Sequence, residues 1–254
     1  MIHRLKRMNI SSGSFSSTGL AHLSSMELWQ SNLIKLVAFS SMLSDHTGVA
    51  LFPNDLAWRI VGRIAFPLFA YQLGVGYKHT SDKRSFAFRL LLFALVSQLP
   101  YYLVRGEWVL NIFFTLLIGL GALHLYASKR QGWLGPYLLA SLVLSYFVPY
   151  DGGGYGVLMI FLLYALPTFA GQVAAVIALN FLYLVSSEDF LYNFSSFGYV
   201  QMFSLLAIPL LWGIKYLHLP LQVEGRLSRF NKWIFYVLYP LHLSVLWTLK
   251  IVLT

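Results

Sequence analysis

Two apolar segments set the fold class of this chain: residues 31–52, SNLIKLVAFSSMLSDHTGVALF, and residues 57–77, AWRIVGRIAFPLFAYQLGVGY. Each is an apolar run of about twenty residues, the length that an α-helix needs to cross the hydrocarbon core of a bilayer. Ionisable side chains nevertheless occur in both runs, at Asp45, His46, Arg59 and Arg63. An ionisable group in hydrocarbon costs at least about 2.5–3.5 kcal/mol, so these four residues predict a functional site in the protein interior.

The composition extends this interpretation to the whole chain. Of its 254 residues, 58% are hydrophobic and only 11% are charged, whereas soluble domains carry about a quarter charged residues. We therefore expect an all-α fold: one polytopic bundle of about nine transmembrane helices in a single domain at residues 31–254. The expected spans are residues 31–52, 57–77, 86–104, 109–127, 133–150, 155–169, 171–186, 197–217 and 231–253. The sixth and seventh follow each other closely and can be short, tilted or re-entrant.

The N-terminal segment, residues 1–30, differs from the rest of the chain. It is rich in serine and has no apolar core of the kind that a secretory signal requires, so we expect a cytoplasmic tail. Cysteine is absent, which excludes disulfides, thiolate metal sites and a cysteine nucleophile.

The distribution of Lys and Arg predicts the orientation. If the N-terminus is cytoplasmic, nearly all basic residues of the connections fall on the cytoplasmic side, and Arg105 alone falls on the other. The net charge of +9 then indicates loops facing an anionic leaflet rather than nucleic-acid binding. The basic residues on the cytoplasmic side are Arg4, Lys6, Arg7, Lys78, Lys83, Arg84, Arg89, Lys129, Arg130, Arg226, Arg229 and Lys232.

The first two expected helices bring their ionisable residues to one level. If these helices are antiparallel, Asp45 and His46 lie in the outer half of the first, and the two arginines lie in the outer half of the second. Arg59 and Arg63 share a helix face because they are four residues apart. Asp45 is expected to pair with Arg63 or Arg59, which leaves His46 free, and a kink at Pro67 makes room for a cavity. The alternative is an ion pair that only holds two helices together.

A lysine on the first helix suggests the kind of ligand. Lys35, Met42 and His46 form one stripe, and Lys35 lies about 16 Å below His46 by helical rise. This arrangement suits an elongated anionic ligand that enters from the cytoplasm and reaches the histidine. The alternative is a lysine that extends to the membrane surface near a helix end.

Other polar residues are weaker candidates. His242 lies near the middle of the last expected helix, on the same face as Tyr239, and is a candidate second polar centre. Asn111 and Thr115 share a helix face, where an interhelical hydrogen bond is the simpler interpretation. Histidine spacings typical of metal sites are absent, so we expect no metal.

Several motifs together resemble the TraX family of integral membrane proteins, which is associated with N-terminal acetylation of conjugative pilin. The resemblance covers most of the chain from about Ser31 onward, and it is specific in combination although each motif alone is weak. The motifs are Leu36-Val37-Ala38 through Met42-Leu43-Ser44-Asp45-His46, Gly62-Arg63-Ile64-Ala65-Phe66-Pro67-Leu68-Phe69, Asn111-Ile112-Phe113-Phe114-Thr115, Tyr155-Gly156-Val157-Leu158 and Phe235-Tyr236-Val237-Leu238-Tyr239-Pro240-Leu241-His242.

The resemblance implies an activity and a location. The family is similar to transmembrane acyltransferases, which take an acyl group from acyl-CoA, and it suggests a multi-pass protein of the bacterial inner membrane. It implies an acetyl-CoA-dependent N-acetyltransferase acting on a pilin subunit. His46 is then the general base, beside Asp45 and Arg63. Substrate-binding residues are expected at Lys35, Arg59, Asn111, Tyr155 and His242.

Other functions fit the same residues. A transmembrane acyltransferase acting on a surface glycan or another membrane protein is one alternative. A proton-coupled transporter is a second, although no inverted repeat is visible. A structural component of a pilus assembly complex is a third, in which conservative replacement of the buried charges would be tolerated.

Overall fold

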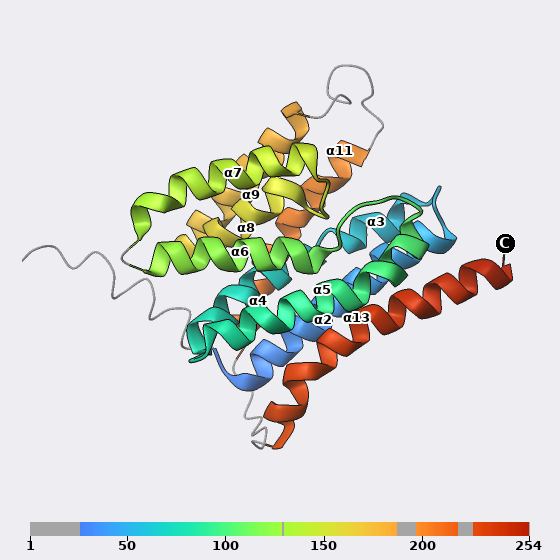
Figure 1. Ribbon diagram of the computed structural model, residues 1–254, viewed down its shortest axis with the longest axis horizontal. Coiled ribbons are helices and arrows are strands. Elements are labelled where there is room, and N and C mark those ends of the chain that lie inside the picture. Colours follow the sequence, from blue (N-terminus) through green and yellow to red (C-terminus); the bar gives the residue numbers. More distant parts are fainter. Residues whose placement is uncertain (1–25, 129, 187–196, 218–225, 254) are drawn as a thin grey trace, which may run out of the picture.

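The computed structural model describes residues 26–128, 130–186, 197–217 and 226–253 (Figure 1). The described residues form helices joined by short connections, with one isolated β-bridge between Leu110 and Tyr150. The expected all-α fold is confirmed. Most of the expected N-terminal tail, residues 1–25, lies outside the described residues.

The expected spans coincide with helical segments. The helices are α2 (Leu28–Leu51), α3 (Leu56–Gly62), α4 (Ala65–His79), α5 (Lys83–Arg105), α6 (Ile112–Ala127), η1 (Gln131–Trp133), α7 (Leu134–Phe147), α8 (Gly153–Ala165), α9 (Phe169–Ser186), α11 (Phe197–Val200), η2 (Gln201–Leu206), α12 (Ala207–Tyr216) and α13 (Arg226–Leu253). The second expected span is broken into α3 and α4. The eighth is three consecutive pieces, of which η2 is a 3-10 helix.

The break between α3 and α4 lies close to the expected kink. The α3 helix ends at Gly62 and α4 starts at Ala65, with Pro67 in its first turn. Proline is tolerated there because the amides of a first turn have no partner within the helix. Arg63 therefore lies at the interruption of the helix, just before the place where Pro67 was expected to bend it.

Two helices in the described part of the chain, residues 83–105 and 233–253, are long and apolar enough to cross a membrane. Three shorter apolar helices accompany them, at residues 112–127, 153–165 and 169–185. Large apolar side chains such as Leu99 and Val252 point outward, as expected where the surrounding solvent is hydrocarbon. These features are those of a membrane protein. The nine spans and their orientation stay predictions.

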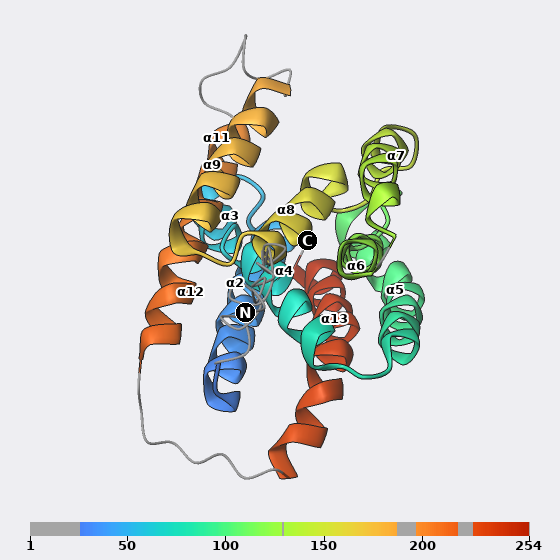
Figure 2. The ribbon, with the colours of Figure 1, turned by 90° about the vertical axis from the view of Figure 1, so that its left-hand side faces the viewer.

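The helix α2 lies at the centre of the half of the molecule that contains the ionisable residues. It packs against α3, α4 and α13, and α13 also runs along α5 (Figures 1 and 2). The helix α8 packs against α4, α6, α7 and α9. As a result α13, the last helix in the sequence, lies beside α2, the first one described.

Candidate active site

A cavity of about 1170 Å³ extends through the centre of these helices. One end is lined by Lys35 and Arg89, together with the acids Glu27 and Asp82 at the starts of α2 and α5. The other end is lined by Arg105 and Asp151. His46 lies in the wall between them. Asp45, His46, Arg59 and Arg63, the residues that predicted an interior site, all line this cavity.

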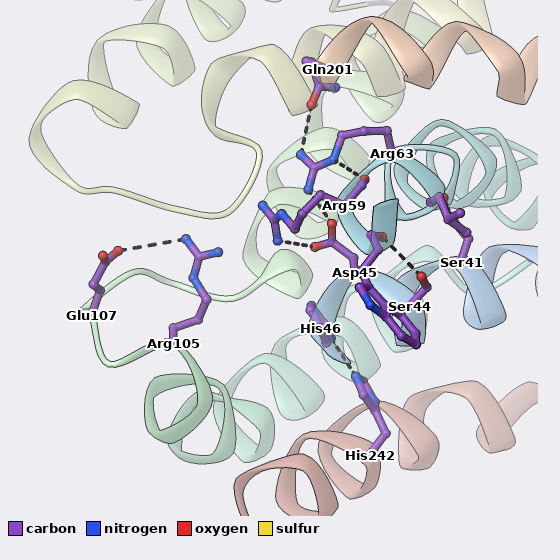
Figure 3. A network of polar contacts seen from close by, with 12 residues as sticks. Ser41, Ser44, Asp45, His46, Arg59, Arg63, Arg105, Glu107, Gln201 and His242 are labelled. Atoms are coloured by element: carbon purple, nitrogen blue, oxygen red, sulfur yellow. Dashed lines mark hydrogen bonds and ion pairs between the residues drawn. The ribbon is translucent and has the colours of Figure 1, made fainter. Parts of the chain in front are cut away.

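Asp45 is paired with both arginines (Figure 3). Its Oδ2 accepts a hydrogen bond from Arg59 Nη1 at 2.9 Å, and its Oδ1 accepts one from Arg63 Nη2 at 2.5 Å. The expected pairing with one arginine is therefore confirmed and extended to the second. Because one carboxylate is shared by two guanidinium groups, the cluster keeps a net positive charge beside His46.

Short polar contacts hold α3 against α2 at this level. The Ser41 hydroxyl donates to the Val61 carbonyl at 2.5 Å, and the Ser44 hydroxyl donates to the Trp58 carbonyl at 3.2 Å. These hydroxyls satisfy backbone oxygens near the end of α3, where intrahelical donors run out. They fix the distance at which Asp45 on α2 meets Arg59 and Arg63.

The close approach of α3 to α2 also depends on Gly62. A Cβ atom at Gly62 would overlap the side chain of Asp45, which packs against the glycine. We expect Gly62→Ala to displace the Asp45 carboxylate and to lower catalytic activity while α3 itself remains helical. The matched control is Gly135→Ala, since a Cβ at Gly135 meets no atom within 4 Å. Activity of Gly62→Ala equal to that of the control would refute the dependence on this close approach.

His46 is not free, as had been expected, but is hydrogen-bonded to His242 of α13. Its Nδ1 lies 2.7 Å from His242 Nε2, and the two rings are nearly parallel, at 4° (Figure 3). His242 Nδ1 lies 2.9 Å from the carbonyl oxygen of Leu238. His46 is among the residues that line the cavity, whereas His242 is behind it.

These contacts fix the positions of the protons. A carbonyl oxygen only accepts, so His242 Nδ1 carries a hydrogen and donates it to Leu238. Both rings are buried, which favours neutral imidazoles. In a neutral His242 the Nε2 atom is then an acceptor, and His46 Nδ1 must be the donor. The remaining nitrogen of His46, Nε2, therefore has a free lone pair.

A chain of polar side chains extends from Arg63 into α8, α9 and η2. Arg63 Nη1 donates to Gln201 Oε1 at 3.1 Å, and Gln201 Nε2 donates to the Tyr155 hydroxyl at 2.9 Å. Tyr155 in turn donates to Asn180 Oδ1 at 2.8 Å, and Asn180 Nδ2 bonds Ser204. Tyr155 and Gln201 both line the cavity, so this chain supports the arginine on one side of it.

Asn111 is used by the fold itself. Its Oδ1 caps α6 by accepting from the Phe113 amide at 3.1 Å, and its Nδ2 donates to the Ala94 carbonyl at 2.7 Å and to Gln98. The side chain is fully buried and is not part of the cavity wall. Asn111 therefore has a structural role, which is to position α6 against α5. Lys35 and Arg59 do line the cavity.

Sequence reasoning missed three features of this cavity. It did not pair His46 with His242, because their separation by 196 residues leaves no local signal. It assigned no role to Asp151 and treated Arg105 only as a loop charge. Both line the cavity, and a glycine run after Asp151 was the available signal that this turn is unusual.

Within the described residues, no group of three or more His, Asp or Glu side chains is arranged to hold a metal ion. The expectation that the protein needs no metal is not tested by this.

Comparison with known proteins gives related sequences. The chain is 28% identical to the probable fimbrial assembly protein FimC, serogroup H1, of Dichelobacter nodosus, over 87% of this chain and 95% of that protein. It is 31% identical to the protein TraX of Escherichia coli K12, over 53% of this chain and 55% of that protein. The uncharacterized protein RP591 of Rickettsia prowazekii is 27% identical over 70% of this chain and 67% of that protein. No solved structure matches.

The family comparison covers nearly all of the described residues. The profile of the TraX protein family matches residues 30–250, which include all the cavity-lining residues except Met26, Glu27 and Leu28. On this extent of match, the chain belongs to the TraX family.

Proposed function

We propose that this protein is a membrane-embedded acetyltransferase that moves an acetyl group from acetyl-CoA to the N-terminal amine of a pilin subunit. The observation that carries the proposal is the pair His46–His242. The pair leaves one nitrogen of His46, a residue of the cavity wall, with a free lone pair, next to the positively charged cluster of Asp45, Arg59 and Arg63. A base beside a cationic cluster suits acyl transfer, in which a proton is removed while negative charge develops on a carbonyl oxygen.

Acetyl transfer from the thioester to the amine needs only the side chains already described. The neutral amine attacks the thioester carbonyl carbon, and one N–H proton passes to His46 Nε2. The carbonyl oxygen becomes an oxyanion, which Arg63 or Arg59 stabilises. When the oxyanion collapses, the C–S bond breaks, and protonated His46 returns its proton to the sulfur of CoA. The products are an amide and free CoA.

The shape of the cavity and the two cations at one of its ends support acetyl-CoA as the donor. CoA is an elongated polyanion, and the end of the cavity lined by Lys35 and Arg89 attracts its phosphates. Lys35 lies about 16 Å along α2 from His46, since eleven residues separate them. The thioester end of a bound CoA then reaches His46, with the phosphates at Lys35 and Arg89.

The pilin acceptor is supported by the name of one relative. The Dichelobacter relative is described as a fimbrial assembly protein, and it is aligned over 95% of its length. The chain spans about half the length of the Escherichia coli relative, 55%. The proposal requires that the pilin N-terminus reaches the membrane surface where the predicted outer end of the cavity lies.

His242 acts on the reaction through His46. His242→Leu removes the acceptor for His46 Nδ1–H, so His46 no longer holds its proton on that nitrogen. We expect kcat to fall about 10–100-fold, as for other partners that orient a reactive histidine, with little change in the KM for acetyl-CoA. His242→Gln retains an acceptor oxygen and should recover part of kcat. Equal losses in the Leu and Gln variants would contradict the positioning role.

The function itself is tested with purified protein in proteoliposomes. Acetyl-CoA and a pilin precursor are added, and release of free CoA thiol is followed. Acceptor-dependent release supports acetyl transfer. Release that requires a membrane glycan instead of pilin would keep the acyltransferase and replace the acceptor. Proton-driven solute uptake without any thiol release would replace the proposal by a transporter.

A further inference from the structure

The end of the cavity opposite Lys35 is formed by a turn with an unusual backbone. Asp151 lies between α7 and α8, followed by Gly152 and Gly153 with φ angles of +81° and +50°. These left-handed values favour glycine and let the chain reverse within two residues. The reversal places the Asp151 side chain in the wall of the cavity.

The backbone of Asp151 is held in place on both sides. Its amide donates to the Leu110 carbonyl at 2.8 Å, and its carbonyl accepts a hydrogen bond from the Thr115 hydroxyl. Leu110 and Tyr150 form the isolated bridge at the same point. The turn is therefore anchored to the start of α6, and the direction of the Asp151 side chain is set by these contacts.

The carboxylate of Asp151 has an unused capacity to accept hydrogen bonds. Among the described residues, it makes no ion pair within 4 Å, since Arg105 is paired instead with the exposed Glu107 at 3.9 Å. The Tyr101 hydroxyl lies next to the carboxylate and is buried without a hydrogen bond of ordinary geometry. The Asp151 carboxylate in the cavity wall therefore faces the buried Tyr101 hydroxyl and has no cationic partner within 4 Å among the described residues.

The charges around Asp151 come from several helices. Arg105 of α5, Arg63 and Arg59 of α3 are cations that act on its carboxylate, and Asp45 of α2 is an acid that does so. Burial raises the pKa of the Asp151 carboxyl above its ordinary value, and Arg105 opposes this shift. A second cation bound beside the carboxylate would favour its charged form further.

Tyr101 connects this turn to the proposed base. Its ring packs edge-on against His46, with centroids 6.4 Å apart, while its hydroxyl is next to Asp151. A small group held between Asp151 and the Tyr101 hydroxyl is thus one side chain away from His46. That is the position from which an acceptor would approach a thioester that arrives from the end of the cavity lined by Lys35 and Arg89.

We infer that Asp151 and the Tyr101 hydroxyl form the binding site for the amino group of the acceptor, and that the substrate of this site is therefore a primary amine. The inference rests on the proposed acyl transfer. An ammonium group has three N–H donors and no acceptor, which matches a carboxylate and a phenolic oxygen. The acceptor arrives as an ammonium and releases one proton to water. The resulting amine keeps an N–H hydrogen bond to Asp151 while another N–H proton passes to His46.

Two kinds of amine fit this chemistry, a peptide N-terminus and a lysine side chain. They are separated with two pilin-derived peptides, one with a free N-terminus and no lysine, the other with a blocked N-terminus and one lysine. A third peptide carries a hydroxyl in place of its N-terminal amino group. Transfer to each peptide is measured with labelled acetyl-CoA in proteoliposomes, as kcat/KM.

The decisive variant is Asp151→Asn, which keeps the shape and removes the charge. We expect the preference for the amine over the hydroxyl peptide, as a ratio of kcat/KM, to fall at least about 10-fold, equal to 1.4 kcal/mol. This ratio is insensitive to the fraction of folded protein. Tyr101→Phe should also lower this ratio of amine to hydroxyl kcat/KM. The control Asp55→Asn changes an exposed acid that caps α3, and asparagine caps helices equally well, so its ratio should match the wild type.

The outcomes separate this inference from the proposed function. Wild-type transfer to an amine with an unchanged ratio in Asp151→Asn would overturn the amine site and leave the acetyltransferase intact. Absence of any wild-type transfer would overturn both. Transfer to the lysine peptide, but not to the free N-terminus, would support the amine site and change the source of its ligand.

Discussion

His46→Gln lowers kcat for acetyl transfer by about 10²–10⁴-fold, the range that a positioned general base contributes. Glutamine has a similar reach but cannot accept a proton at neutral pH, so the hydrogen bond to His242 can be kept while the basic nitrogen is lost. The chain should still insert and fold, because His46 is held mainly by packing between α2 and α13. The measurement is single-turnover transfer from labelled acetyl-CoA, which isolates the chemical step.

The matched control for this variant is His124→Gln. His124 is an exposed histidine of α6 outside the cavity wall, and its ring lies 3.3 Å from the Tyr77 hydroxyl. Its replacement should leave the rate within about twofold of the wild type, the scatter expected for a surface substitution. Activity in His46→Gln equal to that in His124→Gln would remove His46 from the mechanism.

Asp45→Asn is expected to destabilise the fold as well as to reduce activity. It leaves Arg59 and Arg63 side by side without their shared carboxylate. Breaking a buried ion pair from one side costs about 3–5 kcal/mol, and the partial exposure of this cluster lowers the expected cost to roughly 2–4 kcal/mol. Thermal unfolding of the purified protein in detergent should therefore begin at a lower temperature than in the wild type.

A second ion pair offers the comparison for Asp45→Asn. Glu107→Gln also removes one acid from an arginine, but Glu107 is 70% exposed and lies 3.9 Å from Arg105. Solvent screens such a pair, so the unfolding temperature should change little. Equal thermal stabilities of the two variants would show that the Asp45 cluster is not an important support of the helices α2 and α3.

The features that could be predicted from the sequence are local ones. The apolar runs predicted helices because their length and period are visible in consecutive residues. The pairing of Asp45 with arginine was predictable, since the three residues lie on adjacent helices within twenty positions. The stripe of Lys35 and His46 on one face of α2 followed from the helical repeat, and both residues line the cavity.

The features that could not be predicted depend on how distant helices pack. His242 meets His46 because α13 returns to lie beside α2, and no pattern in either helix encodes that neighbour. Asp151 faces the cavity because two left-handed glycines reverse the chain and Leu110 anchors the turn. Asn111 was read as a possible contact with substrate, whereas its amide completes hydrogen bonds within the fold. Residue type and sequence position do not distinguish these uses.

The role of His46 in acetyl transfer to pilin is tested by locating the acetyl group on the product. Reconstituted wild-type protein and His46→Gln are each incubated with isotopically labelled acetyl-CoA and pilin, and the N-terminal peptide of the pilin is analysed by mass spectrometry. We predict labelled acetyl on the N-terminal nitrogen with the wild type and none above background with the variant. Equal labelling by both proteins, or no labelling by the wild type, would contradict acetyl transfer by His46.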